Sequence, residues 1–262
     1  MTVNMLEHAS RSEFNWQEKV VFAYIDEPPF AWPGTDGRPA GCDVEIALTI
    51  LKAIGVRQVE TRLVTFTDLL PGVMAGRWTM TTALFVTVER SRWVDFSRPI
   101  WALSDGFIMR TGNPKVLINY EALAADDTAR LGVVKDTVQR QTALNAGIPV
   151  DRIVELATQD EVVAALLAGQ VDVYASTAMG HRAFVRRAGD ARLAVVDLVP
   201  ANTIGERTAP VFGAFAFAKS NGGLRQVFDL ALKAYLGSAE HSTLMARYGF
   251  TNADIDRVVE QH

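Results

Sequence analysis

The most informative stretch of this chain is Ala83-Leu84-Phe85-Val86-Thr87-Val88-Glu89-Arg90, continuing as Ser91-Arg92-Trp93-Val94-Asp95-Phe96-Ser97-Arg98-Pro99. An arginine guanidinium is planar and permanently charged, so Arg90 can hold a carboxylate through two parallel hydrogen bonds. The alternative is a surface arginine paired with Glu89 or Asp95. That alternative is the usual one for an arginine, and only the pattern around Arg90 argues against it.

Length and composition favour two globular lobes. The 262 residues suffice for two lobes of about 100 to 150 residues, and 49% hydrophobic residues can give each lobe a core. The chain has 26 Lys and Arg against 30 Asp and Glu, a net charge of −4, and no basic run. We therefore expect no nucleic acid and no anionic membrane as a partner. No apolar run reaches the roughly 20 residues of a membrane span.

The cysteine and histidine content argues against metal chemistry. Cys42 is the only cysteine, which excludes an internal disulfide and a cysteine-based metal site. The four histidines, His8, His181, His241 and His262, show no ligand spacing, so we expect neither a metal site nor a cofactor. The first residues lack the basic flank and apolar core of a signal peptide. Either an export signal has been removed or the chain stays in the cytoplasm.

Short apolar runs alternate with amphipathic segments in two series, as is typical of α/β folds. The expected strands are 20–25, 56–64, 131–134, 153–156, 171–175, 193–198 and 211–218. The expected helices are 43–55, 67–76, 137–147, 158–169 and, towards the end, about 222–237, 239–247 and 252–260. Asp43 is expected to cap the first helix, and Thr158 with Glu161 forms a capping box for the fourth.

The two series predict that a second lobe is inserted into the first. They are joined at 106–113 and again near 206–212, so we expect lobe 1 to comprise 1–110 and 209–262, and lobe 2 to comprise 111–208. Paired crossings of this kind form a hinge. Because ligands of open α/β sheets bind outside the carboxyl ends of the strands, the two lobes are expected to share one cleft.

Several motifs, in order, resemble the family 3 solute-binding proteins of ABC importers over about residues 20 to 250. Thr87, Glu89 and Arg90 match the family's Gly-Met-Thr-x-Thr-x-Glu-Arg segment, and 95–99 matches its Asp-Phe-Ser-x-Pro tail. The other matching pieces are Gly41-Cys42-Asp43-Val44-Glu45-Ile46-Ala47, Leu69-Leu70-Pro71-Gly72-Val73-Met74-Ala75-Gly76, Gly169-x-Val171-Asp172-Val173 and Tyr248-Gly249-Phe250. The resemblance implies a periplasmic, monomeric, two-lobed binding protein of type II. Such a protein captures a small zwitterion without turnover and presents it to a membrane permease.

Two departures from the family pattern bear on the ligand. Phe85 stands five residues before Arg90, where the family usually has a Thr or Ser hydroxyl. Thr177 stands where many members have the aspartate that binds the α-amino group. The resemblance also implies that Thr137 clamps the ligand carboxylate from the second lobe, although plain helix capping is the other interpretation. We therefore do not expect an ordinary α-amino acid held in the usual way.

Aromatic residues are expected to converge near Arg90. Phe30 follows the first strand, Phe66 precedes the second helix, and Phe85 belongs to the motif itself. Aromatic faces attract cations, and Glu27 adds a single carboxylate beside them. These positions, with the tract 145–152, resemble the ectoine and hydroxyectoine binders of family 3. The competing interpretation is that a loop phenylalanine is more often a core residue.

Three alternatives stay open. In the first, the ligand is a polar or cationic amino acid or an opine. In the second, the chain is an enzyme resembling cyclohexadienyl dehydratases, with Glu27 as the only available acid or base. In the third, it is a sensory domain, which the missing signal peptide favours. Trp101 is balanced between cleft and core. The residues expected to contact ligand are Glu27, Phe30, Phe66, Phe85, Arg90, Trp101, Thr137 and Thr177.

Overall fold

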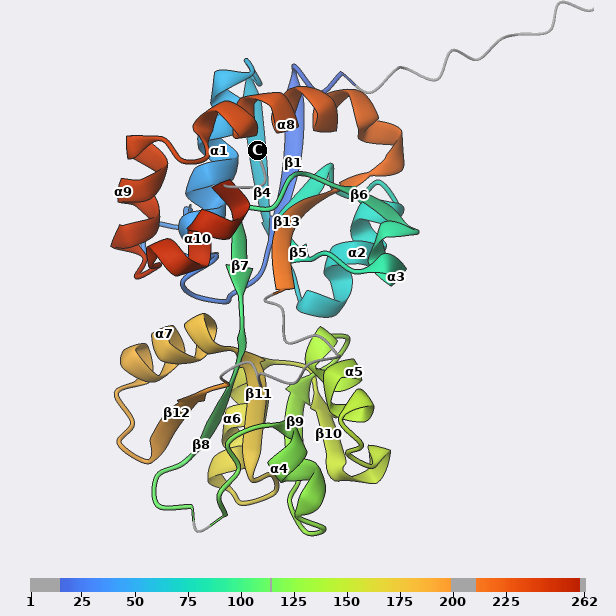
Figure 1. Ribbon diagram of the computed structural model, residues 1–262. Helices are drawn as coiled ribbons and strands as arrows, with labels where there is room; N and C mark the ends of the chain where they lie inside the picture. The colour runs from blue at the N-terminus through green and yellow to red at the C-terminus, as the bar shows by residue number, and fades with distance from the viewer. Residues whose placement is uncertain (1–14, 114, 199–210, 260–262) are drawn as a thin grey trace, which may run out of the picture.

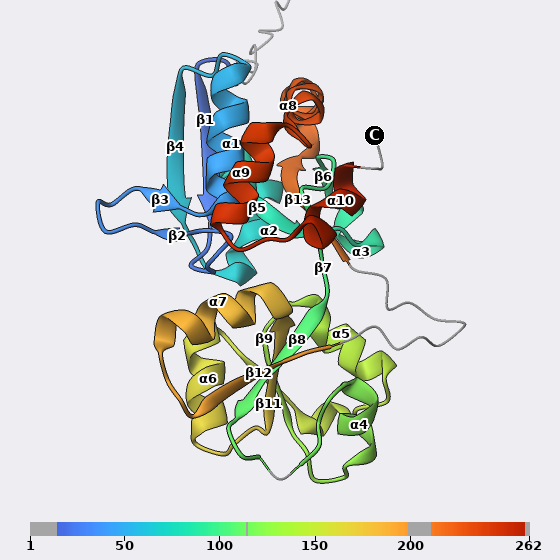
Figure 2. The same cartoon turned by 60° about the vertical axis from the view of Figure 1, so that its left-hand side comes forward.

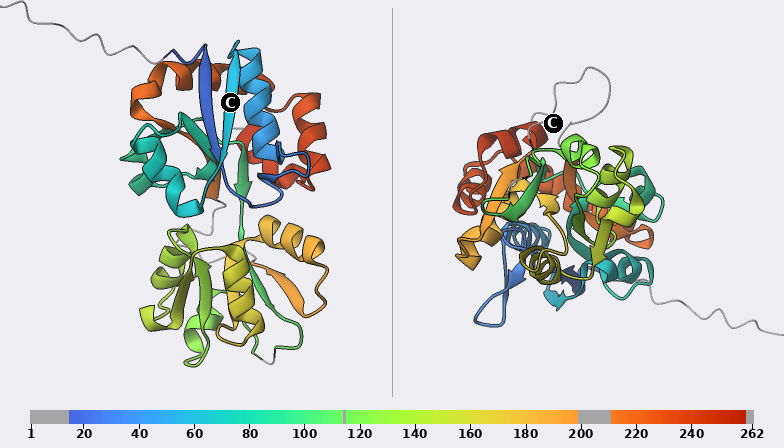
Figure 3. Two further views of the ribbon diagram at one scale, coloured as in Figure 1. Left: turned by 180° about the vertical axis from the view of Figure 1, so that it is seen from behind. Right: turned by 90° about the horizontal axis from the view of Figure 1, so that it is seen from below.

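The computed structural model describes residues 15–113, 115–198 and 211–259. These residues form two lobes stacked one above the other (Figure 1), each built on its own sheet with helices against it. The view from behind shows the same two bodies along the long axis of the molecule (Figure 3). The predicted two-lobed α/β architecture with a mixed sheet in each lobe is confirmed.

The sheet of the first lobe has the order β4-β1-β5-β13-β6, with β7 also paired to β13. β1 is parallel to β4 and β5, whereas β13 is antiparallel to β5, β6 and β7. Every residue from Gly213 to the end of β13 is buried, because helices cover both faces of the sheet. The strands are β1 (Lys19–Tyr24), β4 (Gln58–Leu63), β5 (Met80–Phe85), β6 (Val94–Phe96), β7 (Trp101–Leu103) and β13 (Val211–Ala218).

The first helix of the first lobe buries one apolar face. Val44, Ala47, Ile50 and Leu51 are buried along α1, which begins after Gly41. A short hairpin, β2 (Trp32–Pro33) with β3 (Pro39–Ala40), precedes it. The helices are α1 (Cys42–Ala53), α2 (Phe66–Met74), α3 (Val88–Ser91), α8 (Gly222–Tyr235), α9 (Ala239–Arg247) and α10 (Asn252–Val259), with a 3-10 turn at Lys219–Asn221.

The sheet of the second lobe has the order β10-β9-β11-β8-β12. β9 is parallel to β10 and β11, and β8 is antiparallel to β11 and β12. The strands are β8 (Asp105–Arg110), β9 (Leu131–Val134), β10 (Ile153–Leu156), β11 (Val173–Thr177) and β12 (Leu193–Asp197). The helices are α4 (Tyr120–Ala125), α5 (Val138–Asn145), α6 (Gln159–Leu167) and α7 (Ala178–Ala188), with a 3-10 turn at Val150–Arg152. As predicted, Thr158 Oγ1 accepts a hydrogen bond from the Glu161 N–H (3.2 Å) at the start of α6.

The chain passes from the first sheet to the second at Ser104, between β7 and β8 (Figure 2). The predicted division lay after residue 110, but all of β8 pairs within the second sheet. The return crossing expected near 206–212 lies mostly outside the described residues. None of the helices in the described ranges is long and apolar enough to cross a membrane.

The lobes touch through apolar side chains. Phe66, at the start of α2, packs against apolar clusters of both lobes. Met179, in α7 of the second lobe, belongs to the same buried cluster as Phe30 and Phe85 of the first. The region between the sheets is therefore a built interface, and the candidate site lies there.

Candidate functional site between the lobes

Arg90 lies in α3, directly after β5, in a position fixed by backbone contacts. Its N–H donates to Oγ1 of Thr87, the N-cap residue of this helix (3.1 Å). The guanidinium donates from Nη1 to the Phe85 carbonyl oxygen (3.0 Å) and from Nη2 to the carbonyl oxygen of Asp136 in the other lobe (3.1 Å). Arg90 thus connects the two lobes at the carboxyl end of β5.

Among the described residues, the buried charge of Arg90 has no ion-pair partner. The residue is 9% exposed, and within the described ranges no carboxylate forms an ion pair with it. The predicted alternative, an ion pair with Glu89 or Asp95, is therefore not what the structure shows. Burial lowers the pKa of Arg90 to about 10, and the charges of Glu89 and Asp136 only partly oppose this shift. An uncompensated buried cation of this kind favours an anionic ligand.

Three aromatic rings form a continuous wall on the first lobe. The Trp101 ring lies between Phe30 (centroids 5.3 Å apart, planes at 44°) and Phe85 (5.5 Å, 82°). Phe30 is held because its carbonyl oxygen accepts from the Asp43 N–H at the start of α1 (3.0 Å). The fourth ring, Phe66, faces the Arg90 guanidinium with 5.6 Å between Cζ and the ring centroid.

Glu27 supplies the carboxylate of the site. Its backbone is tied into the loop after β1, where its N–H donates to the Ala31 carbonyl oxygen (2.7 Å). Burial, together with the nearby charge of Asp43, raises the pKa of Glu27 to about 7. Across the interface, a Cβ added to Gly180 of α7 would lie 3.5 Å from Phe30 Cε2 and 3.9 Å from Glu27 Oε1. The first turn of α7 therefore approaches the carboxylate closely, without a side chain between them.

The second lobe contributes hydroxyl groups at helix starts. Thr177 Oγ1 accepts from the Gly180 N–H (3.0 Å) and so caps α7. Thr137 precedes α5, but its hydroxyl donates to the Val134 carbonyl oxygen (2.7 Å) and caps nothing. Thr137 therefore occupies the N-cap position of α5 without a side-chain cap bond, whereas the Thr177 hydroxyl forms the cap bond of α7.

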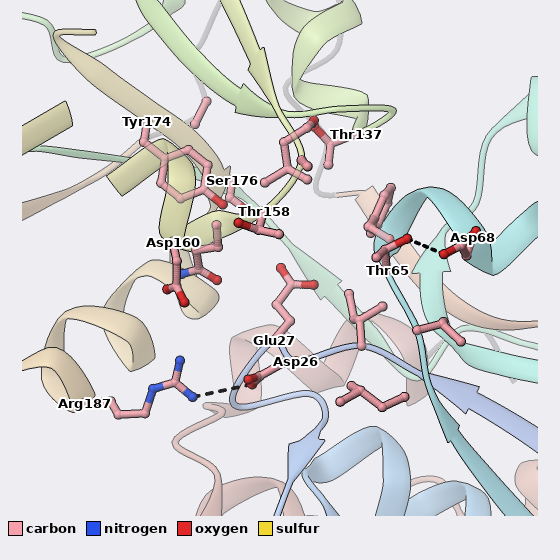
Figure 4. A pocket seen from close by; sticks show the side chains of 18 of the residues that line it. Asp26, Glu27, Thr65, Asp68, Thr137, Thr158, Asp160, Tyr174, Ser176 and Arg187 are labelled. Carbon is pink, nitrogen blue, oxygen red and sulfur yellow. Dashed lines mark hydrogen bonds and ion pairs between the residues drawn. The ribbon is translucent and has the colours of Figure 1, made fainter. Parts of the chain in front are cut away.

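The structure brings all eight predicted residues together. They line one inner cavity of about 50 Å³, and Glu27, Phe66 and Thr137 also face an adjoining outer cavity of about 640 Å³ (Figure 4). The outer cavity carries three further carboxylates. Asp26 pairs with Arg187 of α7 (3.6 Å), Asp68 accepts from the Thr65 hydroxyl (2.6 Å), and Asp160 lies in the first turn of α6. The inner residues are Glu27, Phe30, Phe66, Phe85, Arg90, Trp101, Thr137 and Thr177.

Sequence reasoning misassigned Asp43, which was expected to cap α1. The N-cap is Gly41, and no side-chain cap bond is formed there. The Asp43 carboxylate instead lies behind the aromatic wall, where it accepts from Trp101 Nε1 (3.0 Å) and Thr82 Oγ1 (2.8 Å). The position of Asp43 in the Gly-x-Asp motif could have drawn attention to this residue. Its hydrogen-bond donors, Trp101 and Thr82, are distant in the sequence and become known from the tertiary structure. In the described ranges, no three His, Cys, Asp or Glu residues group as a metal site.

Comparison with known proteins agrees with this geometry. The model of the bacterial extracellular solute-binding proteins, family 3, matches residues 20–251. EhuB, solved in complex with hydroxyectoine, is similar with a TM-score of 0.80 and 29% identity, over 93% of this chain and 95% of that chain. The probable amino-acid ABC transporter periplasmic-binding protein y4tE of Sinorhizobium fredii is 25% identical over 245 residues, which cover 92% of this chain and 80% of that protein.

An ancestral arginine-binding protein bound to arginine is a more distant neighbour. It shares 21% identity with a TM-score of 0.76, over 89% of this chain and 99% of that chain. At this identity the likeness concerns the fold alone.

Proposed function

This chain belongs to the bacterial extracellular solute-binding proteins, family 3, and from this premise we propose that it binds a small zwitterionic solute between its lobes. The solute is delivered, without turnover, to the membrane permease of an ABC importer. The protein acts as a periplasmic monomer. Its lobes, which the chain joins at Ser104, close over the ligand by a hinge motion.

The buried guanidinium of Arg90 carries the proposal. Two of its donors are used by the Phe85 and Asp136 carbonyl oxygens, which leave its positive charge uncompensated. A carboxylate bound at the remaining N–H groups supplies the missing negative charge through charge-assisted hydrogen bonds. Because the Asp136 carbonyl belongs to the second lobe, the ligand carboxylate binds where closure also takes place.

The opposite side of the inner cavity suits a cation. Glu27 is a carboxylate for which no described residue provides an ion pair, and the rings of Phe30 and Phe85 stand beside it. Aromatic faces hold delocalised or quaternary cations at roughly 0.5 to 2 kcal/mol each when desolvated. A ligand that carries both charges within a compact frame satisfies both ends of the cavity.

Ectoine and 5-hydroxyectoine meet these requirements. The flat amidinium ring stacks on the aromatic wall and donates to Glu27, while the carboxylate binds Arg90. The likeness to EhuB in complex with hydroxyectoine supports this choice. Thr177 supports it as well, because an uncharged residue there removes the aspartate with which many family members bind an α-amino group.

A cationic amino acid or opine is the second candidate, and the outer cavity favours it. A volume of about 640 Å³ is larger than a compact ring needs. Its wall carries Asp26, Asp68 and Asp160 in addition to Glu27, whereas its two arginines are Arg77 and Arg187. A long side chain that ends in a cation would extend into this space. The likeness to y4tE supports amino-acid transport in general.

The test is a thermal-shift screen against ectoine, hydroxyectoine, proteinogenic amino acids and opines, with calorimetry on each hit. A ligand at a hundred times its Kd adds about 2.7 kcal/mol of stability, which corresponds to several degrees. Binding of ectoine or hydroxyectoine alone supports the first candidate, and binding of arginine or an opine alone supports the second. If no compound shifts the unfolding temperature and the protein turns over prephenate or arogenate, the chain is an enzyme and both proposed ligands are wrong.

A further inference from the structure

Asp43 is a buried carboxylate with no role in the ligand contacts proposed above. It is 0% exposed in the first turn of α1. Oδ1 accepts from Trp101 Nε1 (3.0 Å) and Cys42 Sγ (3.4 Å), and Oδ2 accepts from Thr82 Oγ1 (2.8 Å) and the Ala83 N–H (3.0 Å). All four groups donate to the carboxylate, and this arrangement matches the ionised form.

No cation balances this charge within the described ranges, where Asp43 forms no ion pair. Burial raises the pKa of Asp43 to about 6, while the bonds from Trp101 and Thr82 oppose the shift. The carboxyl is therefore mainly ionised at neutral pH. An uncompensated negative charge directly behind the three packed rings costs free energy of folding, which points to a role in the site.

The indole of Trp101 transmits the effect of Asp43 to the cavity. Its N–H is fixed by Asp43, and a Cβ on Gly213 of β13 would lie only 2.1 Å from the Trp101 ring carbons. The ring is therefore clamped between a carboxylate and a strand that leaves space only for a glycine. Because Phe30 and Phe85 both pack against this ring, its position sets the shape of the whole wall.

The same contact changes the electrostatics of the wall. A hydrogen bond to a carboxylate polarises the donor group, so the Trp101 ring becomes richer in electrons and its face attracts a cation more strongly. Asp43 also acts on the site directly, since its charge is one of the two causes that raise the pKa of Glu27. At a pH above the Glu27 pKa of about 7, where Glu27 is ionised despite this shift, the polarised ring and the charge of Asp43 both favour a positively charged ligand group in the inner cavity.

We propose that Asp43 is a positioning residue that gives the aromatic wall its preference for cations, by holding Trp101 and by placing a fixed negative charge behind the rings. This role rests on the proposed binding of a zwitterion. It adds a determinant of specificity that does not touch the ligand.

The first experiment needs no ligand. The pKa of Glu27 is measured by carboxyl-carbon NMR in the wild type and in Asp43→Asn. We expect a lower value in Asp43→Asn, because the raising charge is lost while burial remains. An unchanged pKa would overturn the electrostatic part of the proposal. The other titratable and charged groups that line the cavities around Glu27 are common to both proteins: Asp26, Asp68, Arg77, Asp160, Tyr174 and Arg187 in the outer cavity, and Arg90 in the inner one.

The second experiment compares ectoine with pyroglutamate, a cyclic carboxylate that has a neutral amide in place of the amidinium. At about pH 8.5, where Glu27 is ionised in both proteins because its pKa is about 7 or lower, we expect Asp43→Asn to weaken ectoine binding about tenfold, about 1.4 kcal/mol, and to leave pyroglutamate binding unchanged or stronger. An equal loss for both compounds would show a merely structural role. If wild-type protein binds no ectoine, the proposed ligand fails, while the Glu27 titration still tests Asp43.

Two further variants separate charge from packing. Cys42→Ala removes one donor but keeps the charge, and we expect at most about a threefold change in ectoine affinity. Trp101→Phe removes the N–H and keeps a ring, so in a double-mutant cycle with Asp43→Asn the two losses should be less than additive. Full additivity would contradict transmission through the indole.

If circular dichroism shows that Asp43→Asn does not fold, Trp101→Phe alone must lower the preference for ectoine over pyroglutamate, or the proposal fails.

Discussion

The two walls of the cleft differ in chemistry. The first lobe contributes three packed rings, the buried guanidinium of Arg90 and two carboxyl groups, those of Glu27 and Asp43. In the described ranges, none of these three charged residues has an ion-pair partner. The second lobe contributes hydroxyl groups and helix starts, at Thr137 and Thr177. From this difference we infer that the first lobe selects the proposed ligand and that the second lobe closes over it.

The largest expected effect follows from removing Arg90. Arg90→Ala leaves the ligand carboxylate buried without a partner, and we expect calorimetry to show about a hundredfold weaker binding, about 2.7 kcal/mol. The exposed Arg92 at the end of the same helix is the matched control. Arg92→Ala should bind like the wild type, and an equal loss in both variants would remove Arg90 from the site.

Phe85 tests whether the rings act as a cation-binding wall. We expect Phe85→Thr, which restores the hydroxyl usual in the family, to weaken ectoine binding at least about tenfold, about 1.4 kcal/mol. Phe85→Leu keeps apolar bulk but has no π face. If Phe85→Leu binds ectoine as tightly as wild type, the wall contributes burial only and the comparison of the two lobes loses its cation argument.

The pH dependence of binding tests Glu27. Because its pKa in the unliganded protein is about 7, the ionised fraction falls about tenfold between about pH 8 and pH 6, and the affinity for a cationic group falls with it. In Glu27→Gln this dependence should disappear. A similar slope in both proteins would assign the titration to another group.

The carboxyl group of Glu27 also makes folding stability depend on pH. Stability falls as the pH rises, whereas ligand affinity rises. The pKa of Glu27 is raised from 4.5 in the folded protein, so folding takes up a proton, and the stabilisation present below about pH 4.5 is lost as the pH rises through about 7. Above pH 7, thermal unfolding of unliganded Glu27→Gln should therefore occur at a higher temperature than that of the wild type. A lower Tm for this variant would contradict the burial argument.

The smallest effect on affinity is expected in the second lobe. Thr177→Val removes the cap of α7, so we expect about 1 kcal/mol lower stability with at most about a threefold change in affinity. Thr158→Val, which removes the corresponding cap of α6, is the matched control. If Thr177→Val weakened binding as much as Phe85→Thr, the second lobe would share in ligand selection.

Much of the candidate site was visible in the sequence. Because Glu27, Phe30 and Phe66 follow or precede regular elements, alternation of strands and helices places them at one edge of a sheet. Thr87 and Arg90 are three positions apart in the sequence, so the cap of α3 forms locally. The predicted division after residue 110 lies too late along the chain, because the crossing is at Ser104. The apolar pattern of a strand does not show to which of two sheets it belongs.

The two-lobed α/β class, most of the helices and the residues that face the cleft could be predicted from local periodicity and short motifs. The strands β5 and β8, which lie inside the two sheets, were not among the expected strands. The groups that contact the buried charges became known from the tertiary structure. Asp43 meets Trp101 from 58 positions away, and Arg90 reaches the Asp136 carbonyl across the interface. Such contacts depend on the packing of distant strands, which no local pattern encodes, and they give the site its buried guanidinium and the carboxyl group behind the rings.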